Sequence, residues 1–251
     1  MKTAFVTGVT SGFGKAIATR LAGLGYNLVL TGRRKQRLDD LCGFVNTNFS
    51  VKVYPLCFDV RDNEACKTAI FSLPEEFKNI DLLVNNAGLA AGATPFQETD
   101  VDDFDRMIDT NVKGLLYVTK LLVPQMIDRK SGHIINISSI AGIEVYPGGS
   151  VYCASKHAVN AITKGLRLDL VKYGIKVSSV SPGMAETEFA IVRYHGDEEK
   201  AKAVYKGLVP LNAEDIADTV EFIVTRPAHV SINDIQLNPA QQANTYVQHR
   251  V

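Results

Sequence analysis

Short runs of apolar and mostly β-branched residues recur along the chain, separated by longer stretches of helical character. The runs cover residues 3–7, 28–31, 51–56, 82–84, 133–138, 176–180 and 234–237. Several of them are apolar throughout rather than alternating with polar residues, which is typical of strands covered on both faces. Seven strands that alternate with helices predict an α/β fold in which one parallel sheet carries helices on both sides.

Length and composition favour a single domain. The chain has 251 residues, of which 46% are hydrophobic and 22% charged, the balance of a globular protein with a substantial core. Although domains usually have about 100 to 200 residues, α/β folds of this length often form one unit. No internal repeat or linker interrupts the pattern, so we expect one domain over residues 1–251.

Residues 186–210 form the segment least suited to regular packing. The segment follows Pro182-Gly183 and contains Arg193, Tyr194, His195 and a charged run at 197–200. Because loops at strand ends often carry function, we predict a substrate lid here. A pair of solvated surface helices is the alternative for its charged part.

Charge and cysteine content narrow the classes of partner. Lys plus Arg equals Asp plus Glu at 27 each, so no global field attracts nucleic acid or an anionic membrane, and small molecules are the expected partners.

The first strand starts too early for a signal peptide, and no run reaches the roughly 18 apolar residues of a membrane span, which predicts a cytoplasmic protein. The spacing of the four cysteines, Cys42, Cys57, Cys66 and Cys153, fits neither a metal site nor a disulfide framework.

A glycine-rich turn follows the first expected strand. It reads Thr7-Gly8-Val9-Thr10-Ser11-Gly12-Phe13-Gly14 and leads into a helix expected from about Gly14 to Gly25. Glycines permit a tight turn and let a pyrophosphate approach backbone N–H groups at the positive end of a helix. At the first strand-to-helix junction of such a sheet, this turn predicts a bound dinucleotide.

The ends of the next strands carry residues that can contact the same dinucleotide. Arg33 and Arg34 stand where an acidic residue would bind the ribose diol of NAD, and two guanidinium groups suit a 2'-phosphate, which predicts NADP. The alternative is that both arginines are solvated at a helix start. Asp59-Val60 can hold the adenine, and the turn Asn85-Asn86-Ala87-Gly88 can lie beneath the cofactor.

Tyr152 and Lys156 provide a candidate proton-transfer pair downstream of Ser139. On a helix, positions i and i+4 share one face, so the Lys156 ammonium can favour the phenolate of Tyr152. Lowering a tyrosine pKa from about 10 to about 7 takes roughly 4 kcal/mol, which Lys156 and an oxidised nicotinamide could supply together. An exposed helical pair without chemistry is the alternative reading of this spacing.

Together these residues resemble the short-chain dehydrogenase/reductase family over essentially the whole chain. Residues 7–14 fit T-G-x-x-x-G-x-G, residues 85–88 fit N-N-A-G, and Ser139, Tyr152 and Lys156 fit the serine and Y-x-x-x-K. Asn111, and Pro182-Gly183 with Thr187, fit two further family segments. The resemblance implies a Rossmann-type doubly wound domain with a seven-stranded parallel sheet, and a homotetramer.

The resemblance also implies roles for individual residues. Tyr152 would be the acid/base, Ser139 the donor to the substrate oxygen, Lys156 the ligand of the nicotinamide ribose, and Asn111 the organiser of a water relay. Ser138 points to the other side of its strand and is expected to pack. The cofactor would contact Gly8, Thr10, Ser11, Gly12, Phe13, Gly14, Arg33, Arg34, Asp59, Val60, Asn86, Ala87, Gly88, Tyr152, Lys156, Pro182, Gly183 and Thr187.

Several downstream segments resemble a narrower subgroup, the NADP-dependent 3-hydroxy acid dehydrogenases. These segments are 85–92, 188–189, 192–194, Gly196, 227–230 and 238–239. The likeness implies oxidation of serine, L-allo-threonine, 3-hydroxypropionate or similar acids, or reduction of the matching semialdehydes. A reductase of sulfonated aldehydes, a general small carbonyl reductase and a non-catalytic NADP(H) sensor are the alternatives.

Arg193 is predicted to bind the acid group of the substrate. It lies within the predicted lid, where closure would bring its guanidinium over the nicotinamide and clamp a carboxylate. The alternative is a surface arginine that pairs with Asp197 or Glu198.

Overall fold

All seven expected strands lie in one sheet of the computed structural model, which describes residues 1–251. Every neighbouring pair is parallel, and the strand order is β3-β2-β1-β4-β5-β6-β7. This confirms the predicted α/β fold with a seven-stranded parallel sheet. The strands are Thr3–Thr7 (β1), Asn27–Gly32 (β2), Val53–Cys57 (β3), Leu82–Asn85 (β4), Gly132–Ile137 (β5), Ile175–Pro182 (β6) and Asp234–Leu237 (β7).

Alternate residues of the central strands enter two separate apolar cores, one on each face of the sheet. In β2, Leu28 and Leu30 join the core beneath α1 (Gly12–Gly23), α2 (Lys35–Asn48) and α10 (Ala213–Val224). Val29 joins the opposite core. That core is covered by α3 (Asn63–Phe71), α4 (Glu75–Lys78), α6 (Leu115–Arg129) and the end of α7 (Ser150–Leu170). Burial on both faces explains why the strands are apolar throughout.

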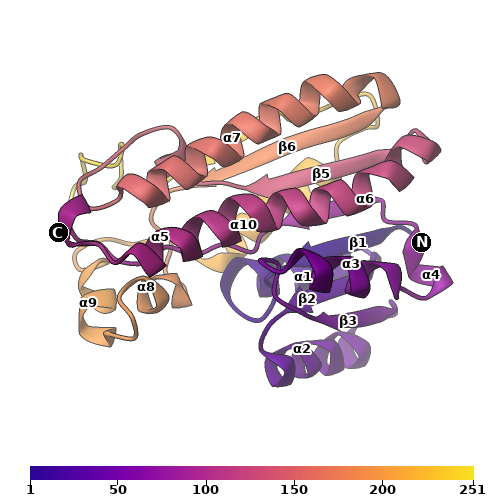
Figure 1. Cartoon of the computed structure of the whole chain (residues 1–251), viewed down its shortest axis with the longest axis horizontal. Helices are drawn as coiled ribbons and strands as arrows, with labels where there is room; N and C mark the ends of the chain where they lie inside the picture. Colours follow the sequence, from indigo (N-terminus) through magenta and orange to yellow (C-terminus); the bar gives the residue numbers. More distant parts are fainter.

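The strand order reverses beside β1, whose neighbours are β2 on one side and β4 on the other. In open α/β sheets, ligands bind outside the carboxyl ends of the strands at such a switch point. These ends face α8 (Glu188–Arg193) and α9 (Glu198–Ala203), far from the N-terminus (Figure 1). The topology therefore places the glycine turn and the other family motifs at the same edge of the sheet.

The remaining elements connect these layers. α5 (Val101–Ile108) passes through a π-helical turn, η2 (Asp109–Gly114), into α6. Short 3₁₀ turns lie at η1 (Phe96–Glu98), η3 (Ile140–Gly142) and η4 (Val171–Tyr173). The predicted lid segment 186–210 contains both α8 and α9, so it is more regular than its sequence indicated.

Element boundaries differ slightly from the sequence expectations. β6 continues to Pro182 because its carboxyl end pairs with β7, and α1 occupies Gly12–Gly23 rather than running from Gly14 to Gly25.

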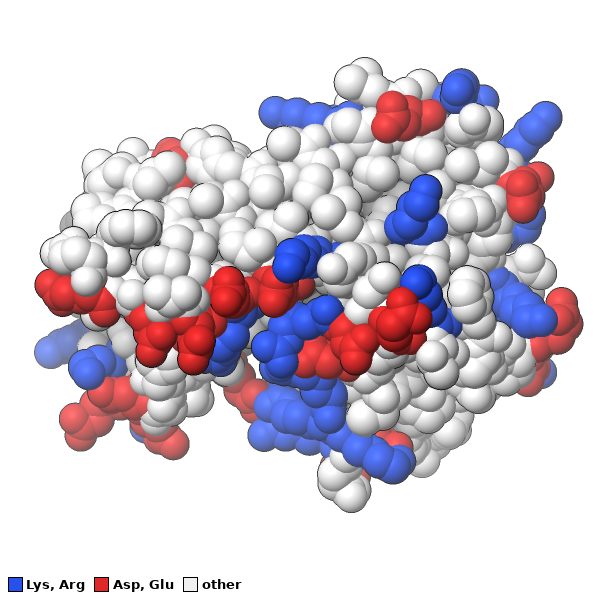
Figure 2. Space-filling view, viewed as in Figure 1, with Lys and Arg blue, Asp and Glu red and all other residues white.

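The four cysteines are free thiols. No helix has both the length and the apolar character needed to cross a bilayer. Acidic and basic side chains are mixed over the face in Figure 2, with basic ones gathered where Figure 1 has α2.

Candidate active site

A cavity of about 650 Å³ opens at the carboxyl ends of the strands. Its size falls within the roughly 300 to 1,000 Å³ usual for small-molecule sites. It brings together nearly all the predicted site residues, namely Gly8, Thr10, Ser11, Gly12, Phe13, Arg33, Arg34, Asp59, Val60, Asn86, Ala87, Gly88, Ser139, Tyr152, Lys156, Pro182, Gly183, Thr187 and Arg193. Gly14 and Asn111 lie behind the cavity wall, both of them buried.

The glycine turn is bonded to the 85–88 turn of the neighbouring strand. The amide of Asn86 donates to the carbonyls of Thr7 (2.8 Å) and Gly8 (3.1 Å). The Thr7 hydroxyl accepts from the backbone N–H groups of Asn86 and Ala87. Gly8 has a φ of +71°, and a Cβ there would lie 2.8 Å from the Cα of Ala87. Only glycine therefore fits at this position, where the two turns form one rigid floor.

The two arginines at the end of β2 are both exposed but differ in how far they are bonded to the protein. Arg34, the N-cap residue of α2, donates from Nε to the Thr10 hydroxyl (3.1 Å) and from Nη1 to Glu188 (2.8 Å). Arg33 makes one long contact, 3.4 Å from Nη1 to Asp59. The simpler alternative of two solvated side chains at a helix start is therefore wrong for Arg34.

This edge of the cavity has the chemistry that a dinucleotide phosphate needs. More than half of the Arg33 side chain is exposed, and its single long contact leaves N–H groups for an anion. Two buried hydroxyls at the cavity wall, of Thr31 and Thr110, have no protein partner. Because buried polar groups normally have partners, these hydroxyls can bond to a ligand. The residues present thus fit NADP.

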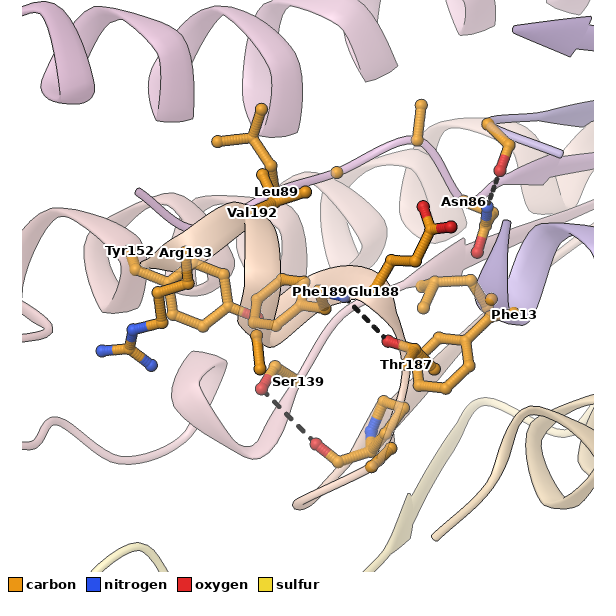
Figure 3. Close-up of a pocket in the computed structure, with 18 of the residues that line it drawn as sticks. Phe13, Asn86, Leu89, Ser139, Tyr152, Thr187, Glu188, Phe189, Val192 and Arg193 are labelled. Carbon is orange, nitrogen blue, oxygen red and sulfur yellow. Dashed lines mark hydrogen bonds between the residues drawn. The ribbon is translucent and has the colours of Figure 1, made fainter. Parts of the chain in front are cut away.

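Tyr152 lies on α7, buried to 7% exposure, with its ring 5.6 Å from that of Phe189 on α8. Figure 3 shows these two rings close to Ser139. Burial raises the pKa of the Tyr152 phenol, and the nearby Ser139 hydroxyl and Arg193 offset this only in part. The Nζ of Lys156 lies 6.0 Å from the centre of the Tyr152 ring.

Lys156 and Asn111 lie on either side of Gly88. Lys156 Nζ donates to the Ile137 carbonyl (3.0 Å), and burial lowers the pKa of Lys156 to about 8. Asn111, in the π-helical turn, bonds through its amide to both backbone groups of Leu89 at 2.8 Å. A Cβ on Gly88 would lie 3.2 Å from Asn111 Oδ1 and 3.4 Å from Lys156 Nζ. A larger residue at Gly88 would therefore require Asn111 or Lys156 to shift by a few tenths of an ångström.

Ser138 and Ser139 make different contacts at the end of β5. The Ser138 hydroxyl is buried and faces the Lys156 carbonyl at 3.5 Å. The Ser139 hydroxyl accepts from the N–H of Ala141 (3.1 Å) and donates to the Pro182 carbonyl (3.4 Å). Of the two, the Ser139 hydroxyl lies near Tyr152, where it acts to lower the pKa of the phenol.

Arg193 is a half-buried cation without a carboxylate partner. Its Nε donates to the Gly92 carbonyl (3.1 Å) and its Nη1 to the Tyr146 hydroxyl (3.0 Å). The surface alternative is wrong, since Asp197 pairs with Lys200 and Glu198 with another lysine of α9. The Nη2 group of Arg193 makes no hydrogen bond within the protein and remains available to a ligand.

Comparison with known proteins identifies the family. The short chain dehydrogenase model matches residues 2–197. The chain belongs to the short-chain dehydrogenase family. It is 46% identical to sulfoacetaldehyde reductase 2 of Chromohalobacter salexigens, covering 95% of this chain and 94% of the relative. It is 43% identical to the NADP-dependent 3-hydroxy acid dehydrogenase of Escherichia coli K12, covering 95% of each chain.

A solved structure of another short-chain dehydrogenase has nearly the same fold. This is the closed form of serine dehydrogenase complexed with NADP+, which has 41% sequence identity and a TM-score of 0.92. The alignment covers 99% of this chain and all of that one. The family predicted from the sequence is thereby confirmed.

Several residues of this short-chain dehydrogenase at or beside the site lie outside the family motifs and were missed. Tyr146, which holds Arg193, precedes Pro147-Gly148, a turn signal that indicates a loop but not its contact 47 positions away. Thr245 and Gln248 reach the cavity wall from the chain end beyond β7. Arg37 on α2 reaches Glu188 on α8, a pairing 151 positions apart. Local sequence patterns carry no signal for such distant contacts.

Proposed function

We propose that this short-chain dehydrogenase is an NADP-dependent oxidoreductase of small 3-hydroxy acids. Serine, L-allo-threonine and 3-hydroxypropionate, or the matching semialdehydes, are the expected substrates. The observation that carries the proposal is Arg193, a half-buried guanidinium without an acidic partner that lines the same cavity as Tyr152 and Ser139. The relatives named 3-hydroxy acid dehydrogenase and serine dehydrogenase support it.

The residues divide the proton chemistry between them. Bound NADP would accept a hydride from the hydroxyl-bearing carbon, or return it in the reverse direction. Tyr152 would take the hydroxyl proton at its Oη during oxidation and give it back during reduction. Ser139 would donate a hydrogen bond to the same substrate oxygen and so stabilise its changing charge. We assign Lys156 to the nicotinamide ribose and Asn111 to a water chain behind it.

The raised pKa of Tyr152 has a consequence for direction. With its phenol protonated, Tyr152 is ready to donate to a carbonyl oxygen, which is the reductive reaction. For oxidation it must first lose that proton, and a nearby positive charge is required because burial opposes the phenolate. The Lys156 ammonium can supply part of that charge below its pKa of about 8.

Arg193 is the residue that we propose binds the acid group of the substrate. Burying a cation without an anion is costly, and a substrate carboxylate would provide the missing charge. The contacts to Gly92 and Tyr146 fix two edges of the guanidinium, so that the free Nη2 has one defined position from which to donate. An acid bound there would leave the adjoining carbon near Tyr152.

We further propose that the 186–210 segment acts as the lid. Its residues Phe189, Val192 and Arg193 line the cavity, and Phe189 packs against the Tyr152 ring. His195, which has a φ of +53°, pairs with the buried Asp103 of α5 at 3.0 Å. The segment is joined to the site by these side-chain contacts and by the backbone hydrogen bond from Gly92 to the Arg193 carbonyl (2.9 Å).

A reductase of sulfonated aldehydes is the second candidate, because one relative is named sulfoacetaldehyde reductase 2. A sulfonate carries the same single charge as a carboxylate and can accept hydrogen bonds from the same guanidinium. The two candidates therefore share the cavity and differ in how much space the acid group needs.

The test is a substrate panel with NADP(H) and NAD(H), run on wild type and Arg193→Ala. It contains serine, L-allo-threonine, 3-hydroxypropionate, hydroxyethanesulfonate and an uncharged aldehyde of similar size. Loss of charge-assisted contacts worth about 1.5 to 3 kcal/mol should raise KM for the acids by roughly 10- to 100-fold. The uncharged aldehyde should hardly respond.

Arg226→Ala is the matched control, since this half-buried arginine stacks on Phe222 and does not line the cavity. Equal effects of Arg193→Ala on charged and uncharged substrates would contradict the assignment. Absence of turnover with every substrate and both cofactors would favour a non-catalytic NADP(H) sensor.

Assembly and location belong to the same proposal. We propose a homotetramer, which rests on the family resemblance and is tested by sedimentation of the purified protein. A cytoplasmic location stays a prediction that cell fractionation would check.

A further inference from the structure

The carboxylate of Glu188 is held by two arginines of α2. Its Oε2 accepts from Arg34 Nη1 at 2.8 Å, and its Oε1 accepts from Arg37 Nη1 at 2.5 Å. Glu188 is the first residue of α8, so the pair of contacts joins the 186–210 segment to the start of the helix that follows β2. In Figure 3 the Glu188 side chain points away from Tyr152 and Ser139.

The remaining donors of Arg34 are already in use. Its Nε bonds to the Thr10 hydroxyl (3.1 Å), and its Nη2 bonds to the Thr10 carbonyl (3.1 Å) and the Ser11 hydroxyl (2.8 Å). These bonds hold the guanidinium against the glycine turn with Nη1 directed at Glu188. Glu188 is therefore the group bonded to Arg34 Nη1, and an anion that binds Arg34 through this nitrogen has to compete with its carboxylate.

That donor lies where the 2'-phosphate of NADP is expected. In folds of this topology the adenosine ribose lies at the end of the second strand, and β2 ends directly before Arg33 and Arg34. A carboxylate with each oxygen on a different guanidinium is a stand-in for two oxygens of a phosphate. Although burial acts to raise it, the pKa of Glu188 is lowered by hydrogen bonds from Arg34 and Arg37, so the group is an anion at neutral pH.

We propose that Glu188 is an internal competitor for the 2'-phosphate, and that Arg37 joins Arg34 in binding the phosphate once Glu188 leaves. The 2'-phosphate, with the larger charge, takes over both guanidinium groups. Glu188 then loses its two partners, and α8 is released from the cofactor turn. NADP binding is in this way coupled to the position of the segment that carries Phe189 and Arg193. The inference rests on NADP as the cofactor in the proposed function, but on no particular substrate.

The test measures binding rather than turnover. Dissociation constants for NADPH, NADH, 2',5'-ADP and 5'-AMP are determined by calorimetry for wild type and Glu188→Gln, which keeps the shape but removes the charge. Two exposed ion pairs of about 0.2 to 1 kcal/mol each correspond to a competition of roughly 2- to 30-fold. Glu188→Gln should therefore tighten NADPH and 2',5'-ADP by about that factor and leave NADH and 5'-AMP unchanged.

Glu198→Gln is the matched control, because Glu198 lies in the same segment but pairs with Lys202 on the surface. It should change none of the four constants. Glu188→Ala provides a second variant with the same expected direction, and circular dichroism checks that both fold. In the Glu188→Gln background, Arg37→Ala should loosen NADPH and 2',5'-ADP again while sparing NADH, because the phosphate then loses one of its two guanidinium groups.

Other outcomes would overturn the proposal. Weaker or unchanged NADPH binding in Glu188→Gln would mean that Glu188 does not compete with the phosphate. Equal tightening of NADPH and NADH would mean that it controls access to the cavity without reading the 2'-phosphate. A wild type that binds NADPH no better than NADH would instead refute the cofactor assignment itself.

Discussion

At the scale of single residues, Tyr152 is the group whose chemistry can be removed most cleanly. Tyr152→Phe keeps the ring that packs on Phe189 but removes the hydroxyl, so turnover should fall by at least ~100-fold, the usual scale for loss of a general acid or base. NADPH binding should change little. Steady-state kinetics and cofactor titration measure the two effects. Tyr54→Phe is the control, because Tyr54 lies on β3 and its ring packs against Phe77 of α4, outside the cavity. Near-normal turnover of Tyr152→Phe would remove this residue from the mechanism.

Gly88 offers a test of how tightly the catalytic side chains are held. Asn111 cannot retreat from a new Cβ because its amide is bonded to Leu89 and to the Ser155 hydroxyl. Lys156 is likewise fixed on the Ile137 carbonyl. Gly88→Ala should therefore displace one of them by a few tenths of an ångström and lower kcat by roughly 10-fold, since misplacement of about 1 Å can cost 100-fold.

The matched control for Gly88→Ala is Gly43→Ala on α2, where a Cβ would meet nothing within 4 Å. That variant should keep full activity. Unaltered kcat in Gly88→Ala would show that the space between Asn111 and Lys156 is not needed for catalysis.

The residues of the site could be predicted to the extent that their chemistry is local in sequence. The helix α7 places Tyr152 and Lys156 on one face, and the end of β5 places Ser139 beside them, so their spacing in sequence was enough to predict that they meet. The pKa of Tyr152 could not be predicted in the same way, because burial by Phe189 and other distant groups determines it. Glu188 belongs to a recognised segment, but its partner Arg37 is found only when α2 and α8 meet.

At the scale of elements, the strands were predictable because burial on both faces makes them apolar throughout. Helix boundaries and the π-helical turn at Asp109–Gly114 were not, since a π turn has no hydrophobic period of its own. That turn places Asn111 behind the wall of the cavity, and π turns are frequent at functional sites. The element least expected from sequence therefore positions one of the motif residues.

α10 provides an element-scale prediction. Its N-cap Asn212 accepts from the N–H of Asp215 at 3.0 Å, and the Asp215 carboxylate accepts from the N–H of Asn212 at 2.8 Å. Asn212→Ala should lower the free energy of unfolding by about 1 kcal/mol, measured by urea denaturation, without changing kcat. Asn212→Ser keeps a side-chain acceptor and should lose much less. Equal losses in both variants would mean that the cap does not stabilise the helix.

At the scale of the whole molecule, the two halves of the sheet contribute different residues to the site. β1 to β4 end in the glycine turn, the arginines and the 85–88 turn, whereas β5 and β6 end in Ser139 and in Pro182-Gly183. Because all strands run in parallel, both halves deliver their residues to the same edge (Figure 1). Sequence order alone predicted this meeting, but not that Thr245 and Gln248 of the chain end line the cavity.

Burial of Lys156 at the centre of the molecule should make stability depend on pH. Its folded pKa of about 8 lies below the value of about 10.4 for an unfolded lysine, so the folded protein releases this proton first. The unfolded chain then binds more protons over that interval, and stability gains from this group as pH rises from about 8 to about 10. Below about pH 8 the buried charge costs stability in full.

Lys156→Met isolates that contribution. The variant removes the charge. The free energy of unfolding of the variant minus that of wild type should therefore be larger at about pH 7 than at about pH 9.5, where wild type has already lost the proton. Urea denaturation at both pH values gives the difference. Lys164→Met, at an exposed position on the same helix, should show no such change between the two conditions. If the difference for Lys156→Met is the same at both pH values, Lys156 keeps an ordinary proton affinity, and its ammonium stays charged throughout the range in which Tyr152 must exchange a proton.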